Sequence, residues 1–180
     1  MRMETAGGVI CKVGKSKGVL NVTAGVWVLV VAVFAVVWYM MLRDTFDVVA
    51  FAATLVVTLA VLACLLCFFL MSPRRVELTA DALVLHRVLG RKVFRYADIA
   101  DAGLWTGKPS CLFRFCGSGA FCGFIGWFSG GGLGTHFEYV GSYADAFYIR
   151  LRRGRTYLLS CDGAEMAVKR VREGMQGKEC

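Results

Sequence analysis

The side chains that could perform catalysis are few, and their spacing does not form a catalytic set. The 180 residues include only two histidines, His86 and His136, which lie fifty residues apart on strand-like segments without nearby acids. A metal site needs at least a third ligand, so two ordinary surface or edge histidines are the favoured interpretation. Gly117-Ser118-Gly119 lacks the spacing and the strand-to-helix setting of a nucleophile elbow. We therefore expect no catalytic residues, no metal site and no cofactor, and we predict that the protein is not an enzyme.

The eight cysteines are interpreted as reduced and mostly buried thiols. Cys64 and Cys67 have the spacing of a redox pair, but both lie inside a long apolar run, where a packing role is favoured. No second pair with this spacing exists to complete a zinc site. The catalytic alternative that remains is an enzyme that uses Cys116, Cys122 or His136 in a glycine-rich groove.

Basic residues are the more informative polar feature. Two sets flank expected hairpin turns: Arg87, Arg91 and Lys92 in the first, and Arg152, Arg153 and Arg155 in the second. Such sets often only keep a domain soluble. The functional interpretation is contact with anionic lipid headgroups, where each basic residue near the surface contributes about 1 kcal/mol. Nucleic-acid binding is not expected, because the chain carries no motif for it and is predicted to be tethered to a membrane.

The residues named so far lie in segments attached to two long apolar runs, Asn21 to Leu42 and Val48 to Met71. Neither contains a charged residue, and each exceeds the roughly 20 residues that cross about 30 Å of hydrocarbon. The polar break between them, Arg43 to Asp47, predicts a hairpin of two membrane-spanning helices over residues 20–71. The spans also lack histidine, and the absence of Asp, Glu, Lys, Arg and His argues against an ion or proton pathway inside them.

Charge predicts the orientation of this hairpin. Residues 1–19 form a basic tail that we expect to be flexible, and residues 73–180 hold 16 Lys or Arg against 10 Asp or Glu. The break between the two spans has a net charge of −1. Short flanks rich in Lys and Arg stay in the cytoplasm. We therefore predict a multi-pass protein of the inner (cytoplasmic) membrane with both termini in the cytoplasm.

Residues 73–176 predict a small, mainly β domain that ends in a helix. Apolar residues alternate with polar ones between glycine-containing turns, which is typical of strands. The last segment changes to a helical period, with one apolar stripe formed by Ala164, Val168, Val171 and Met175. We expect this helix to pack its stripe onto the sheet and to stop near Gly174 or Gly177.

The stretch from Cys116 to Gly134 is unusual because it holds eight glycines and four aromatic residues. It is not a phosphate-binding loop, since no lysine and no helical pattern follow the glycines. One interpretation is a long or bulged strand pair with glycine where backbones approach closely. A second is a loop that enters the membrane interface, and a third is a groove for a partner or ligand. The candidate residues for these two roles are Phe121, Phe124, Ile125, Trp127 and Phe128.

The run from Arg114 to Phe128, followed by Leu133-Gly134 and an aromatic strand, resembles a bacterial pleckstrin-homology-like (PH-like) domain family. The resemblance extends over residues 20–175 and includes the N-terminal pair of spans, the strand-like Asp81 to Arg87 and the turn Tyr96 to Ile99. It implies a partly open seven-stranded barrel that is closed by the C-terminal helix. It implies no catalytic residues, and a shared fold does not by itself give a function.

These observations lead to one expected function and one alternative. We expect a membrane-anchored PH-like binding or scaffold module that acts at the cytoplasmic face without catalysis. Its expected partners are membrane lipids with anionic headgroups and a protein that the sequence does not identify, and a homo-oligomer is a further option. The alternative is an accessory subunit of a membrane protein complex, recognised through its transmembrane hairpin.

Overall fold

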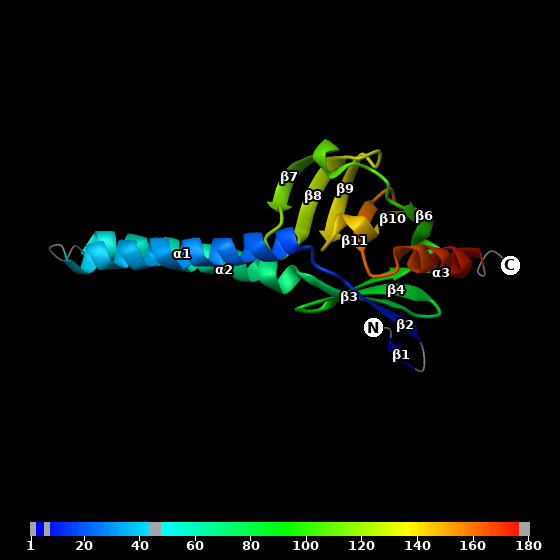
Figure 1. Cartoon of the computed structure of the whole chain (residues 1–180), viewed down its shortest axis with the longest axis horizontal. Helices are drawn as coiled ribbons and strands as arrows, with labels where there is room; N and C mark the ends of the chain where they lie inside the picture. The colour runs from blue at the N-terminus through cyan, green and yellow to red at the C-terminus, as the bar shows by residue number, and fades with distance from the viewer. Residues whose placement is uncertain (1–2, 6–7, 44–47, 177–180) are drawn as a thin grey trace.

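A computed structural model describes residues 3–5, 8–43 and 48–176 of the chain. Figure 1 shows a long helical hairpin that projects from one end of a β-rich domain, with a third helix on that domain. The two hairpin helices are α1 (Lys17–Arg43) and α2 (Val48–Met71). Both are long and apolar enough to cross a membrane by length and composition, and Val19 alone among the residues of these two helices is buried in this chain. The predicted pair of apolar helices is therefore confirmed.

α1 begins four residues before the predicted apolar run because Ser16 caps it. The Val19 N–H donates to the Ser16 hydroxyl at 3.3 Å, and the Leu20 N–H donates to the Ser16 carbonyl at 3.2 Å. These bonds satisfy backbone donors that the first turn of a helix otherwise leaves unpaired. Between the helices, the Trp38 and Phe51 rings meet edge to face, 5.4 Å apart.

The first sheet joins the start of the chain to the segment after the hairpin. Where the sequence predicted a flexible tail, the structure has strands, and Cys11 is buried against Val76 with the rest of this sheet. The five strands are antiparallel neighbours in sequence order. They are β1 (Met3–Thr5), β2 (Gly8–Lys12), β3 (Pro73–Leu78), β4 (Ala82–Arg87) and β5 (Arg91–Arg95).

The second sheet has six strands in the order β6-β10-β11-β9-β8-β7, and all neighbours are antiparallel except β9 and β11. The strands are β6 (Ile99–Leu104), β7 (Leu112–Ser118), β8 (Phe124–Gly130), β9 (Thr135–Val140), β10 (Ala146–Leu151) and β11 (Thr156–Ser160). Short 3-10 turns η1, η2 and η3 cover Tyr96–Asp98, Pro109–Cys111 and Tyr143–Asp145. The resemblance implied one seven-stranded, partly open barrel. The described residues instead form two sheets of five and six strands, and these do not close into a barrel.

The C-terminal helix α3 (Ala164–Gln176) packs on the β-rich domain as predicted, with Ala164, Val168 and Val171 buried. The predicted stop near Gly174 or Gly177 is confirmed, because the helix ends at Gln176, although Gly174 itself lies inside it. A Cβ at Gly174 would collide with the Tyr96 ring, so glycine is placed here for close packing. The alternative stop, Gly177, lies outside the described residues.

The main core lies between the two sheets and α3. It includes Leu83 and Leu85 from the first sheet, Phe147 and Leu159 from the second, and Val171 from α3. A smaller apolar cluster covers the outer face of the second sheet and is centred on Trp105 and Leu158. The polar side chains of interest lie at the edges of these two cores.

Candidate site at the hairpin end of the domain

The β-rich domain is fixed directly to the ends of both helices. α2 ends at Met71 and β3 begins at Pro73, so Ser72 alone separates them. Ser72 is fully buried and donates its hydroxyl to the Cys122 carbonyl at 2.7 Å. The Cys122 N–H donates to the Thr23 hydroxyl of α1 at 2.9 Å. One loop of the second sheet therefore contacts both helices.

This loop, residues 119–123, has an unusual backbone that presents an aromatic side chain to α1. Ala120 and Cys122 have φ angles of 75° and 59°, which cost non-glycine residues free energy. Between them, the Phe121 ring lies 6.3 Å from the Trp27 ring of α1. Burial raises the pKa of the Cys122 thiol, and the nearby Lys15 opposes that shift. A neutral, buried thiol is a packing group rather than a nucleophile.

The turn between β4 and β5 also contacts the hairpin, at the end of α2. The Val88 N–H donates to the Ser72 carbonyl at 3.1 Å, and the Leu89 N–H donates to the Leu70 carbonyl at 3.0 Å. Gly90 closes the turn at a φ of 79°. In Figure 1 this turn reaches toward the helices from the first sheet. The turn is therefore held at the level of the last residues of α2.

Lys92, on the strand that follows this turn, points between the two sheets into a group of aromatic rings. Its Nζ lies 4.2 Å from the centre of the Tyr157 ring. It is also 5.5 Å, 5.6 Å and 5.7 Å from the ring centres of Tyr139, Phe94 and Phe137. The faces of aromatic rings attract a cation, more strongly where water is partly excluded.

Arg87 lies beside the same ring group. A Cβ at Gly90 would be 3.4 Å from its Nη2, so the guanidinium lies near the turn. Burial raises the pKa of the Tyr139 phenol, and the adjacent Arg87 opposes that shift. The Arg87 Nε is buried and has no hydrogen-bond acceptor within the described part of the chain. The ion pairs found among those residues do not include Arg87 or Lys92.

Within residues 3–5, 8–43 and 48–176, Arg87 and Lys92 are therefore two cations without a carboxylate partner. We call them, with Tyr139 and Tyr157, the cationic mouth. A buried donor without an acceptor costs about 1–3 kcal/mol, and a charged donor costs more. The third member of the predicted set, Arg91, is exposed and lies outside the mouth.

The second basic set lies at the opposite end of the strands. β9 ends at Val140, which pairs with Phe124 beside the loop of residues 119–123. β11 runs parallel to β9, so its first residue, Thr156, lies at the end far from that loop. Just before Thr156 come three exposed residues, Arg152, Arg153 and Arg155. Arg152 donates to the Ala97 carbonyl, which follows the end of β5, whereas Arg91 begins β5, so the structure does not bring the two turns together.

The glycine-rich stretch folds as two paired strands with an intervening loop, β7 and β8, and its apolar side chains go to different places. Phe121 contacts α1, whereas Ile125 lies in the core between the sheets. Phe124 packs on Tyr143 over the outer face, with ring centres 4.6 Å apart. Phe128 is buried, and Trp127 is partly exposed with its ring edge-on to Phe137.

The two histidines have acidic partners, which corrects the expectation that they lack nearby acids. His86 Nε2 is 2.7 Å from Glu77 Oε2 at the surface. His136 and Glu138 are both fully buried, with Nε2 and Oε1 2.9 Å apart. The Tyr143 hydroxyl donates to the other Glu138 oxygen at 2.7 Å. His136 is therefore not a surface or edge histidine but part of a sealed polar network.

The pKa of His136 reflects opposing effects in this network. Burial alone lowers it, but the hydrogen bonds to Glu138 and to the Gly134 carbonyl, together with the Glu138 charge, raise it further than burial lowers it. Burial and the Glu138 charge also raise the pKa of Tyr143. No described group of three or more His, Cys, Asp or Glu residues is arranged to hold a metal ion.

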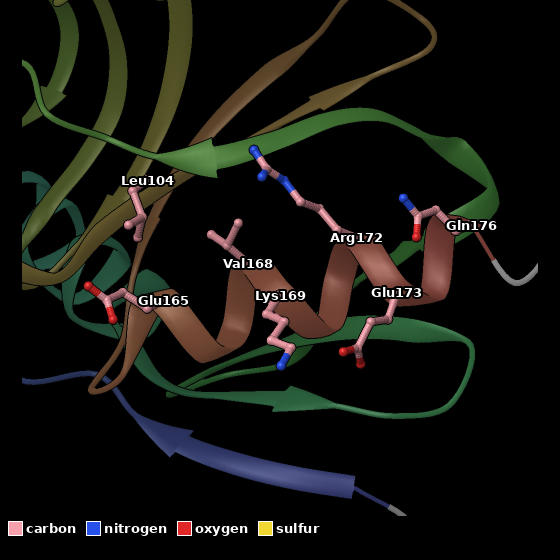
Figure 2. Close-up of a pocket in the computed structure, with 7 residues that line it drawn as sticks. All are labelled: Leu104, Glu165, Val168, Lys169, Arg172, Glu173 and Gln176. Atoms are coloured by element: carbon pink, nitrogen blue, oxygen red, sulfur yellow. The ribbon is translucent and has the colours of Figure 1, made fainter.

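A groove of about 650 Å³ runs between α3 and the edge strand β6. Figure 2 shows Val168 and Arg172 pointing toward β6, while Lys169 and Glu173 point away from it. The Arg172 Nε donates to the Ala102 carbonyl at 2.8 Å and so occupies an unpaired group of the strand edge. The groove carries both signs of charge and has no unpartnered buried donor or acceptor among its described residues. It is a weaker candidate than the cationic mouth.

Several members of the candidate site were not predicted from the sequence. Tyr139, Tyr157, Thr23 and Ser72 received no role, because their partners lie on distant strands or helices. The spacing of Arg87 and Lys92 around a turn was the available signal for the mouth. No known protein family, curated protein or solved structure matches the chain.

Proposed function

We propose that this protein is a membrane-anchored, non-catalytic binding and scaffold module whose β-rich domain works at the cytoplasmic face of the inner membrane. With the PH-like family that its sequence resembles, it shares a strand-rich body with a packed C-terminal helix, behind two apolar helices. The observation that carries the proposal is the cationic mouth, held beside the end of α2. Its proposed ligand is an anionic group presented by the membrane surface.

Charge supports this choice of ligand. Arg87 and Lys92 bring two positive charges to one partly buried place, and the described residues supply no carboxylate to balance them. A phosphate oxygen would give the Arg87 Nε the acceptor it lacks. Hydrogen bonds of this charged kind contribute about 1.5–3 kcal/mol each.

Position supports it as well. The Val88 and Leu89 N–H groups bind carbonyls at the end of α2, so the mouth lies where α2 would leave a bilayer. The start of α1 and the end of α2 are both attached to the same domain. β2 precedes α1 and pairs with β3, which follows α2. The basic flanks of the spans favour the cytoplasmic side for that domain.

The test compares Arg87→Gln with Arg153→Gln in the full-length protein, purified in mild detergent. Anionic phosphatidylglycerol or neutral phosphatidylcholine is added, and the midpoint of thermal unfolding is measured. We expect phosphatidylglycerol to raise the midpoint of the wild-type protein by several degrees, as ligand binding to the folded state requires. Arg87→Gln should lose most of that rise, and Arg153→Gln should keep it.

Arg153 is a matched control because it is an exposed basic residue of another turn, between β10 and β11, and is not part of the cationic mouth. Equal responses of the two variants would contradict a site at Arg87. No difference between the two lipids in the wild-type protein would reject anion binding altogether.

The alternative, an accessory subunit recognised through the hairpin, draws on a different observation. α1 and α2 leave an apolar groove of about 310 Å³ between them, lined by Val33, Phe34 and Thr54 among others. An unrelated two-helix hairpin can replace residues 24–69, which keeps Thr23 and Leu70. Loss of complex formation with an intact domain would favour this alternative over a ligand at the mouth.

A further inference from the structure

Large apolar side chains are exposed on the turn that touches α2 and on the edge strand β7 of the second sheet. Leu89, at the tip of the turn that touches α2, is 64% exposed. Phe113 and Phe115 on β7 are 65% and 61% exposed, and their rings meet edge to face at 5.2 Å. Exposed large apolar groups such as Leu89 and this pair of rings are typical of a surface that contacts another protein or a membrane.

The lengths of the two helices independently give the position of the hairpin end of the domain relative to the hydrocarbon core of a bilayer. About 20 helical residues cross the hydrocarbon core, at about 1.5 Å each. Counted along α2 from Val48, the first residue after the polar break, the crossing ends near Cys67. Leu70 then lies about 5 Å outside the hydrocarbon, within the headgroup layer. The Leu89 N–H binds the Leu70 carbonyl, so Leu89 is at that same level.

The count along α1 gives the same level. Twenty residues back from Leu42 reach Thr23, whose hydroxyl accepts the hydrogen bond from Cys122. Phe121 in the same loop contacts Trp27, which is one helical turn deeper. The loop of residues 119–123 therefore lies at the hydrocarbon boundary, and the turn at Leu89 lies just outside it.

β7 leads into this loop and is the outermost strand of the second sheet on the side of the helices (Figure 1). It is an edge strand, and its register shifts between Arg114 and Cys116, which leaves Phe115 at a bulge. Edge strands in water are usually protected by charge or covered, because their unpaired backbone groups invite pairing. Here Arg114 is the one charged residue in the strand.

We propose that the β-rich domain is seated in the lipid interface, with Leu89 and the Phe113–Phe115 pair inserted among the headgroups. The inference rests on the proposed membrane anchoring, since the depth of the domain in the bilayer is counted along the two helices of the hairpin. Exposed basic residues beside this surface, Arg74, Arg75 and Arg91, complement anionic headgroups. The surface continues the lipid-facing surface of the hairpin, and for this reason lipid rather than a second protein chain is its occupant.

The experiment places the photo-crosslinking residue benzoylphenylalanine at Leu89, Phe113 or Arg153 of the full-length protein in membranes. Resistance to alkaline extraction first establishes that each variant is membrane-inserted. After illumination, mass spectrometry identifies the crosslinked species. We expect positions 89 and 113 to gain the mass of one phospholipid in a several-fold higher yield than position 153. Arg153 provides the control because it is exposed in the turn between β10 and β11, which β9 and β8 separate from β7 in the sheet.

Crosslinks from positions 89 and 113 to a second copy of the chain, or to another protein, would overturn the proposal, because the apolar surface would then be a protein interface. A phospholipid yield no higher than at position 153 would overturn it too. The outcome is separate from that of the proposed function. Loss of the phosphatidylglycerol effect with intact crosslinking would reject the anion site alone, whereas failure of extraction resistance would reject the membrane anchoring on which both rest.

Discussion

Two side chains that would usually face water, His136 and Glu138, are fully buried together on the outer face of the second sheet. Each would be costly alone, since removing one partner of a buried ion pair typically costs about 3–5 kcal/mol. Both ring nitrogens and both carboxylate oxygens of the pair have hydrogen-bond partners. Gly134 supplies a carbonyl to His136, and Tyr143 supplies a hydroxyl to Glu138. The sequence carried a signal for it, because residues two apart on a strand share one face.

This pair makes stability depend on pH in a definite direction. The pKa of His136 is raised in the folded protein, while the pKa of an unfolded histidine is about 6.5. The folded state therefore holds the His136 proton more tightly than the unfolded state does. The contribution of this proton to the free energy of unfolding is fully present below about pH 6.5. It is lost as the pH rises through the raised pKa. We expect the thermal midpoint to fall over that interval.

The control for this prediction is the second histidine of the chain. His136→Gln should remove the fall in the thermal midpoint, and His86→Gln should keep it, because the His86–Glu77 pair is partly exposed and such pairs contribute little. The same pH profile for all three proteins would show that another group titrates.

At the scale of elements, the loop of residues 119–123 acts as the clamp between the second sheet and the hairpin. Thr23→Val removes the acceptor of the Cys122 N–H while it keeps the shape of the side chain. An amide left without its acceptor costs about 1–3 kcal/mol. We expect a lower thermal midpoint and faster protease cleavage between β7 and β8.

Thr58→Val is the matched control in the same hairpin, because the Thr58 hydroxyl donates within its own helix, to the Thr54 carbonyl. Similar losses in both variants would mean that the effect arises in the helix and not in the clamp.

The elements differ in how far the sequence could predict them. The two apolar helices and the stripe of α3 were predicted well because their signals are local and repeat along the chain. β2 was missed because its partner, β3, follows only after both helices. The parallel pairing of β9 with β11 and the aromatic surroundings of Lys92 likewise depend on contacts between distant segments. Local patterns carry little information about such contacts.

For the molecule as a whole, the side of the membrane that holds the β-rich domain can be read from its exposed thiols. Cys111 and Cys116 are exposed, whereas Cys11, Cys122 and Cys161 are buried. With the domain in the cytoplasm, a membrane-impermeant maleimide should label Cys116 in inside-out vesicles and not in right-side-out ones. Peptide mass spectrometry identifies the labelled residue. Labelling of Cys116 in right-side-out vesicles alone would reverse the proposed orientation.

Strands β2 and β3 form an ordinary antiparallel pair, in which Lys12 lies opposite Arg75 and the Val13 N–H donates to the Arg74 carbonyl at 3.1 Å. The loop that connects this pair is the whole helical hairpin. During synthesis, β2 must therefore wait until both helices have been made before its partner exists. A hairpin that inserts with only one helix across the bilayer would leave the two strands on opposite sides, where they could never pair. The first sheet can therefore be completed only after both helices have crossed the bilayer.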